Sequence, residues 1–132
     1  MPNIISTVAF CLLAALSSIA QSQTDLNISA YEQYKSADAV LNRIYKQIVA
    51  EYSEDKEFIK NLRASQRLWV QFRDAELLVK YPQDIDVRNG TVYALCHNSY
   101  MTKLTKERIA TLKQWLIGER QGEVCSGSVR LK

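Results

Sequence analysis

Apolar residues recur at steps of three and four along three stretches of the chain, and this spacing predicts three helices. Across residues 27–52 the apolar stripe consists of Ala30, Tyr34, Ala37, Leu41, Ile44, Ile48 and Tyr52. A second stripe, which Pro82 ends because proline cannot continue a helix, contains Phe58, Leu62, Trp69, Phe72 and Leu77. A third stripe precedes Gly118 and contains Leu95, Met101, Leu104, Leu112, Trp115 and Leu116. No stretch alternates as a strand would, so we expect an all-α fold, an antiparallel three- to four-helix bundle.

Cap and turn residues predict where these helices begin and end. Ser53 is placed to cap the second helix, and acidic residues follow in its first turn at Glu54, Asp55 and Glu57. Residues 82–90 have the Pro, Asn and Gly of a loop, and Thr91 can cap the third helix. Residues 119–132 include two glycines and are expected to form a C-terminal tail.

The N-terminal segment has the pattern of an export signal. Residues 4–20 contain no charged side chain, and small residues stand at Ser18 and Ala20, the positions that a signal peptidase reads. The apolar run is shorter than the roughly 20 residues that span a bilayer. We therefore expect a cleaved signal peptide at 1–20, a helical domain at 21–118 and a tail at 119–132. The mature protein is expected to be periplasmic or secreted, without stable membrane insertion.

Two cysteines, Cys96 and Cys125, remain after this cleavage, and an even number in an exported chain predicts a disulfide bond that tethers the tail. An unbroken helix from Cys96 to residue 117 is roughly 30 Å long, whereas the residues from there to Cys125 reach at most about 26–29 Å. A bond within the chain therefore needs a tail that doubles back, or a break in the third helix that Thr102 or Thr105 could cap. A bond between two chains is the alternative, and the intrachain bond is our expectation.

Composition and charge exclude several classes of function. The 132 residues include 17 Lys and Arg against 14 Asp and Glu, a net charge of +3, and the two signs are interleaved, which argues against nucleic acid as a partner. His97 is the single histidine, which excludes a histidine metal cage. Adjacent helical side chains such as Cys96 and His97 point about 100° apart and do not form a nucleophile–base pair. No glycine-rich phosphate loop occurs. We expect a protein that is not an enzyme and needs no metal or cofactor.

Six polar residues fall inside the apolar stripes: Asp38, Asn42, Gln66, Arg73, Glu76 and Arg108. A buried guanidinium needs acceptors, because an unpaired buried charge is costly. We expect a structural network in which Arg73 and Arg108 donate to the side chains of Asp38, Asn42 and Glu76. Arginines that extend to the surface over apolar neighbours, or a ligand site, are the alternatives. Trp69 and Phe72 are the expected core aromatics beside this network.

The same positions resemble a known family. The run Ala-Asp-Ala-Val-Leu-Asn-Arg-Ile-Tyr at 37–45, the run Gln-Arg-Leu-Trp-Val-Gln-Phe-Arg-Asp-Ala-Glu at 66–76, and the later residues Cys96, Leu104, Arg108 and Leu112 resemble the LprI-type lysozyme-inhibitor family over roughly residues 25–116. This resemblance implies a small exported helical protein of bacteria that binds and inhibits a lysozyme-type cell-wall hydrolase. Relatives often have one cysteine near the position of Ser29 and another directly after the Arg-Asp-Ala-Glu run, where Leu77 stands here. The absence of both fits the loss of one disulfide while Cys96 and Cys125 keep another.

An inhibitor of this kind needs an exposed surface that fits the cleft of a hydrolase. The candidate partner-binding residues are the loop carboxylates Asp84 and Asp86 and the acidic helix junction of Glu51, Glu54, Asp55 and Glu57. The net charge of +3 opposes attraction to a basic lysozyme unless the acidic groups cluster in space. The alternative function is a periplasmic envelope interaction module with a different protein partner and no inhibitory activity.

Overall fold

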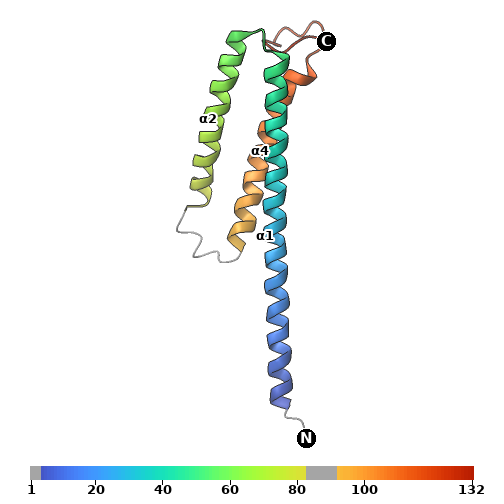
Figure 1. Ribbon diagram of the computed structural model, residues 1–132, viewed down its shortest axis with the longest axis vertical. Helices are drawn as coiled ribbons and strands as arrows, with labels where there is room; N and C mark the ends of the chain where they lie inside the picture. The colour runs from blue at the N-terminus through green and yellow to red at the C-terminus, as the bar shows by residue number, and fades with distance from the viewer. Residues whose placement is uncertain (1–3, 83–91) are drawn as a thin grey trace.

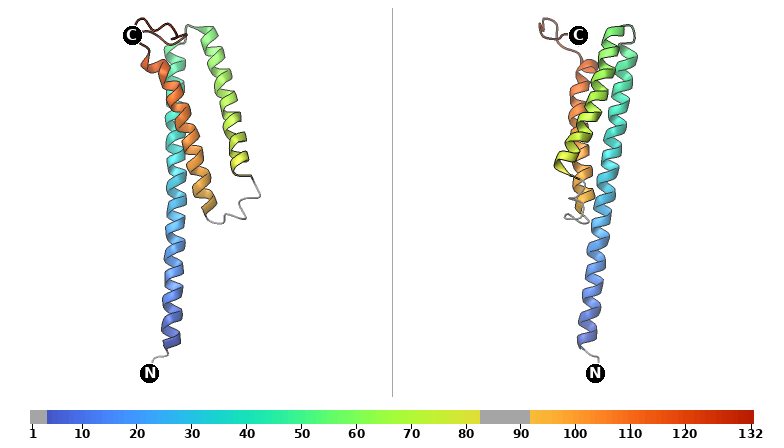
Figure 2. Two further views of the ribbon diagram at one scale, coloured as in Figure 1. Left: turned by 180° about the vertical axis from the view of Figure 1, so that it is seen from behind. Right: turned by 90° about the vertical axis from the view of Figure 1, so that its left-hand side faces the viewer.

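The computed structural model describes the backbone of residues 4–82 and 92–132 and the side chains of residues 22–82 and 92–132. Within these ranges the chain forms three α-helices and no strand, which confirms the all-α class. The helices are α1 (Ile4–Glu51), α2 (Lys56–Lys80) and α4 (Tyr93–Ile117). α1 is the longest and extends alone beyond the other two helices toward the N-terminus (Figure 1). α2 returns from the far end of α1, and α4 runs back alongside α1 (Figures 1 and 2).

α1 is longer than its apolar stripe predicts. The stripe begins at residue 27, but the helix begins at Ile4 and continues without a break past Ala20, where we expect signal peptidase to cut. Neither glycine nor proline occurs between Ile4 and Glu51, so nothing in the sequence interrupts the helix. Cleavage after Ala20 stays a prediction. Among the residues that the structure describes, no helix has a run long and apolar enough to cross a membrane.

Asp55, and not Ser53, caps α2. The carboxylate of Asp55 accepts a hydrogen bond from the backbone N–H of Phe58 at 2.9 Å. Ser53 comes before the start of α2 and lies in the turn between the two helices. In this turn the N–H of Asp55 donates to the carbonyl of Tyr52 at 3.0 Å. The cap predicted at Ser53 is therefore wrong by two residues, while the acidic first turn of α2 keeps Glu57.

α4 is unbroken, so the break that was one of the two ways to an intrachain disulfide does not occur. The hydroxyl of Thr102 donates to the carbonyl of Asn98 at 2.9 Å, one turn earlier, and caps no second segment. The helix ends at Gly118, as predicted, with a φ of 80°, and a Cβ there would lie 2.8 Å from the carbonyl oxygen of Arg130. Thr91 lies outside the described residues, and Val92 precedes the helix without a side-chain cap bond.

The expected intrachain disulfide does not form in this structure, where Cys96 and Cys125 are both free cysteines. The unbroken α4 separates Cys96 from the start of the tail by roughly 30 Å. The tail then turns back on itself at that far end, where the N–H of Glu119 donates to the carbonyl of Arg130 at 2.9 Å and the N–H of Lys132 donates to the carbonyl of Glu119 at 2.7 Å. These bonds hold the tail away from the start of α4, so the two thiols do not meet.

The hydrophobic core lies where the three helices meet, near the turn between α1 and α2. Its buried residues are Leu41, Ile44, Ile48, Tyr52, Phe58, Ile59, Leu62, Ile109 and Leu112. Trp69 and Trp115 pack against this cluster and are partly buried. Phe72 is 57% exposed, so its assignment to the core is wrong. At about 100° per residue, Phe72 points about 80° away from Leu62, whereas Trp69 stays close to the direction of Leu62.

Candidate protein-binding site

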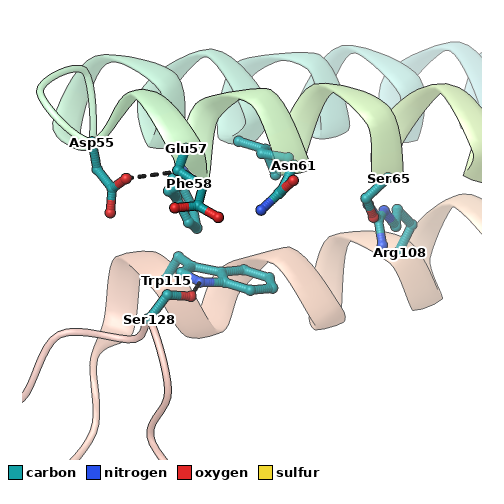
Figure 3. Close-up of a pocket in the computed structure, with 9 residues that line it drawn as sticks. Asp55, Glu57, Phe58, Asn61, Ser65, Arg108, Trp115 and Ser128 are labelled. Atoms are coloured by element: carbon teal, nitrogen blue, oxygen red, sulfur yellow. Dashed lines mark hydrogen bonds between the residues drawn. The ribbon is translucent and has the colours of Figure 1, made fainter.

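A pocket of about 370 Å³ opens between the start of α2 and the second half of α4 (Figure 3). Both helices and the tail contribute to its wall, and its lining residues are Asp55, Glu57, Phe58, Asn61, Leu62, Ser65, Arg108, Trp115 and Ser128. This volume lies at the lower end of the range for ligand sites.

Aromatic rings form the wall of the pocket at the end beside the turn between α1 and α2. The Trp115 ring lies 6.0 Å from the Phe58 ring at an interplanar angle of 55°, and Phe58 lies 4.5 Å from the ring of Tyr52. The indole N–H of Trp115 donates to the hydroxyl of Ser128 at 3.0 Å, which fixes the ring and brings the tail to the pocket. Glu57 projects from α2 toward Trp115 across the opening (Figure 3).

Acidic side chains gather at the same end of the pocket. Glu54, Asp55 and Glu57 are all exposed there, at the turn and in the first turn of α2. Lys56 stands among them in sequence and donates from its ammonium to the carbonyl of Ser53 at 2.7 Å. Residues 51–57 contain four carboxylates against one ammonium. The guanidinium of Arg130 in the tail also lies at this end, 4.1 Å from the centre of the Tyr52 ring, and donates to the carbonyl of Glu51. The negative charge of residues 51–57 is therefore partly offset there.

Arg108 occupies the other end of the pocket. Its Nε donates to the side-chain oxygen of Gln66 at 3.0 Å, and one of its terminal nitrogens donates to the hydroxyl of Ser65 at 3.0 Å. The guanidinium also lies 5.9 Å from the centre of the Trp69 ring. Burial lowers the pKa of the Arg108 guanidinium from its ordinary value, yet the group remains charged because arginine stays protonated in proteins. The pocket is therefore acidic at the end beside the α1–α2 turn, called the outer end below, and basic at the end where Arg108 lies, called the inner end.

Arg73 lies further along α2 and contacts α1. One terminal nitrogen is 2.8 Å from the carboxylate of Asp74, and another is 3.9 Å from that of Asp38. The guanidinium lies 5.3 Å from the centre of the Trp69 ring. Asn42 donates its amide to Asp38 at 2.9 Å and does not accept from an arginine, so the role predicted for Asn42 is wrong. The Arg73 side chain is only 12% exposed, which makes this a contact between helices and not a surface site.

Glu76 contacts a tyrosine in place of the arginines that the sequence predicted. It accepts a hydrogen bond from the hydroxyl of Tyr100 at 3.2 Å, which joins α2 to α4. Nearby, the ring of His97 packs 5.5 Å from Tyr93 and 6.1 Å from Tyr81. No group of three or more metal-ligating side chains occurs in residues 22–82 and 92–132. In the structure, His97 packs in an aromatic cluster with Tyr81 and Tyr93.

The structure brings together only part of the predicted partner-binding set. Asp84 and Asp86 lie outside the described residues, whereas Glu54 and Asp55 stand at the acidic end of the pocket. Sequence reasoning missed Trp115 and Ser128 as members of the site. Trp115 lies close to the helix end at Gly118, which was a signal that its ring could reach an opening. No local pattern points to Ser128, because only the fold of the tail places it there.

The sequence of the chain is similar to a known protein family. The chain matches the family model described as lysozyme inhibitor LprI over residues 15–112.

The chain belongs to the LprI lysozyme-inhibitor family.

An uncharacterized protein of Rhizobium meliloti (strain 1021) is 32% identical over 106 residues, which cover 72% of this chain and 74% of that protein. No solved structure matches the chain. The LprI match includes Asp55, Glu57 and Arg108 but ends before Trp115 and Ser128. The pocket thus joins residues of the LprI match to residues beyond it. The family is named for inhibition and not for catalysis.

Proposed function

We propose that this LprI-family chain is an exported protein that binds a lysozyme-type cell-wall hydrolase and inhibits it, with the pocket between α2 and α4 as the contact. The observation that carries the proposal is a pocket with aromatic walls and an acidic outer end, in a chain of a lysozyme-inhibitor family. Such a pocket fits a lysine or arginine side chain on the surface of a basic hydrolase.

A cationic side chain would gain from each part of this pocket. Its charge would lie over the Trp115 ring, a cation–π contact worth about 0.5–2 kcal/mol, and beside the carboxylate of Glu57. Its aliphatic stem would cover the apolar surface of Phe58 and Leu62. Arg108 at the inner end repels a cation, so the bound charge would stay near Glu57.

The local charge of the pocket answers the objection raised by the net charge of the chain. At physiological ionic strength, charges separated by more than about 8 Å are largely screened from one another. An approaching hydrolase would therefore respond mainly to the charges near the pocket, where the carboxylates of residues 51–57 are only partly offset by Lys56 and Arg130, and less to the overall +3.

The experiment is a titration of the purified protein against a panel of lysozymes, with cell-wall lysis and calorimetric binding recorded at low and physiological salt. We expect stoichiometric inhibition of at least one member. Glu57→Gln should weaken that binding by about fivefold to tenfold, as expected for one charged contact at an interface, and should reduce its salt dependence. Asp55→Ser should weaken it as well while keeping a residue that caps α2.

Glu32→Gln is the matched control, since Glu32 is an exposed carboxylate on α1. It makes the same change of charge away from the pocket and should bind as the wild type does. Wild-type binding by Glu57→Gln would reject the pocket as the contact. Binding to no lysozyme at micromolar concentration would reject the hydrolase and favour the envelope interaction module, whose partner would then be sought by pull-down from periplasm.

A further inference from the structure

The outer face of α2 has a second apolar stripe, separate from the core. Leu68, Phe72 and Val79 are 63%, 57% and 79% exposed, and Ala75 between them is exposed as well. Their steps of four, three and four residues are heptad spacing, which places the four side chains in one line along the helix. This line lies about 110° around the helix axis from Leu62, which is buried in the core. A regular apolar line of this kind is typical of an interaction surface.

We propose that this stripe binds the same stripe of a second copy of the chain, in an antiparallel α2–α2 contact whose twofold axis passes between residues 73 and 74. In that register Phe72 of one copy faces Ala75 of the other, and Leu68 faces Val79. The largest side chain of the stripe meets the smallest on both sides of the axis. The stripe is thus complementary to itself, as an interface with twofold symmetry requires.

A parallel pairing fits the same residues poorly. It would place Phe72 against Phe72 and Ala75 against Ala75, which crowds one layer and leaves a gap in the next. The residues that flank the antiparallel contact bring no like charges together, because Gln71 lies beside Leu78 of the second copy. On the other flank, Glu76 lies beside Trp69 of the second copy.

This dimer leaves the pocket of each copy open. Pairing is confined to the part of α2 between residues 67 and 80, whereas the pocket residues of α2 begin at Asp55 and end at Ser65. The two pockets would lie roughly 40 Å apart along the pair, given a rise of 1.5 Å per residue. The contact spans only two heptads, so we expect a dissociation constant between about 10 µM and 1 mM, as for small transient interfaces.

Sedimentation velocity over a series of protein concentrations tests the dimer. The sample is the wild-type protein in the form that is purified from the producing cells. The wild type should shift from monomer to dimer within that range. Phe72→Glu and Val79→Glu should each raise the dissociation constant by at least about tenfold. Ile28→Glu is the matched control, because Ile28 on α1 is 56% exposed and lies outside the stripe. All three variants should melt at the wild-type temperature when monomeric.

The orientation is tested by cross-linking in a chain whose native cysteines are replaced by serine. Positions 68 and 79 are separated by roughly 16 Å along α2, far more than the 4.4–6.8 Å between Cα atoms in a disulfide. Leu68→Cys alone and Val79→Cys alone should therefore form no disulfide-linked dimer. An equimolar mixture of the two should form one.

Three results would overturn the proposal. The first is a protein that remains monomeric up to 1 mM, and the second is a dimer that Phe72→Glu leaves intact. Cross-linking of Val79→Cys with itself is the third, because it would require the parallel arrangement. If the wild type is monomeric and Phe72→Glu loses binding to a hydrolase, the stripe belongs to that hydrolase contact and the dimer is rejected.

Discussion

Arg108 on α4 donates a hydrogen bond from Nε to the side-chain oxygen of Gln66 on α2, at 3.0 Å. The two residues are 42 positions apart in the sequence. α4 packs closely along α1 but approaches α2 at few points, so this bond is one of the few links across the groove between α2 and α4. It also closes the inner end of the pocket, which connects the stability of the fold to the shape of the site.

Removal of this link should weaken the fold. Arg108→Met keeps much of the aliphatic stem but loses the bonds to Gln66 and Ser65, and we expect a loss of about 1–3 kcal/mol in the free energy of unfolding. Lys113→Met, at an exposed position of the same helix, should change it by less than about 0.5 kcal/mol. Urea denaturation measures both. Equal midpoints for the two variants would show that the bond does not contribute to stability.

Two aromatic residues on α2 should respond very differently to truncation. Trp69 is partly buried and has the guanidinium groups of Arg73 and Arg108 near its ring, so Trp69→Ala should cost about 2–4 kcal/mol. Phe72 is exposed, and Phe72→Ala should cost less than about 0.5 kcal/mol. Thermal melting at low micromolar concentration, where the monomer dominates, compares them. A larger loss for Phe72 would contradict the orientation of α2.

Tyr52 connects the tail to the core, and the loss of its hydroxyl should lower the stability of the protein. Its hydroxyl donates to the carbonyl of Trp115 at 3.1 Å and accepts from the N–H of Arg130 at 3.4 Å, while its ring is buried. Tyr52→Phe leaves both of these groups without the hydroxyl and should cost about 1–2 kcal/mol. Tyr45→Phe, at a partly buried position of the same helix, is the control. Susceptibility of residues 119–132 to proteolysis should increase in Tyr52→Phe alone.

Cys96 and Cys125 should both be reduced in the purified protein, with no disulfide bond between them. A colorimetric thiol assay of the denatured protein should count both Cys96 and Cys125, and in the native protein the exposed Cys125 should react first. Cys96→Ser and Cys125→Ser should each change stability by less than about 0.5 kcal/mol at neutral pH. A loss of about 2–4 kcal/mol together with no reactive thiol would instead establish the disulfide.

Alkaline pH should destabilise the protein in part through Tyr34. Burial raises the pKa of the Tyr34 hydroxyl above its ordinary value of 10.0, since the folded state favours the neutral phenol. This stabilising contribution is fully present below pH 10 and is lost as the pH rises through the raised pKa. Tyr34→Phe should therefore show a smaller fall in melting temperature above pH 10 than Tyr31→Phe does, because Tyr31 is an exposed residue of the same helix. Equal falls for the two variants would contradict this role.

Local pattern determined much of the fold. The spacing of Leu41, Ile44 and Ile48 predicted a buried face of α1, because a helix advances about 100° per residue whatever it packs against. Gly118 ends α4 as expected, since its positive φ favours glycine. The acidic residues around Asp55 were recognised for a similar reason, as carboxylates favour the first turn of a helix.

Tertiary structure decided everything that depends on which surfaces meet. α2 has apolar residues in more than one direction, and the sequence could not say that Leu62 would be buried while Phe72 would stay exposed. The partners of the arginines, the place of Ser128 beside Trp115 and the separation of Cys96 from Cys125 likewise follow from the fold. Periodicity along a helix fixes only the directions of side chains. The neighbour that each side chain meets depends on how the helices and the tail pack together, and that packing created the pocket.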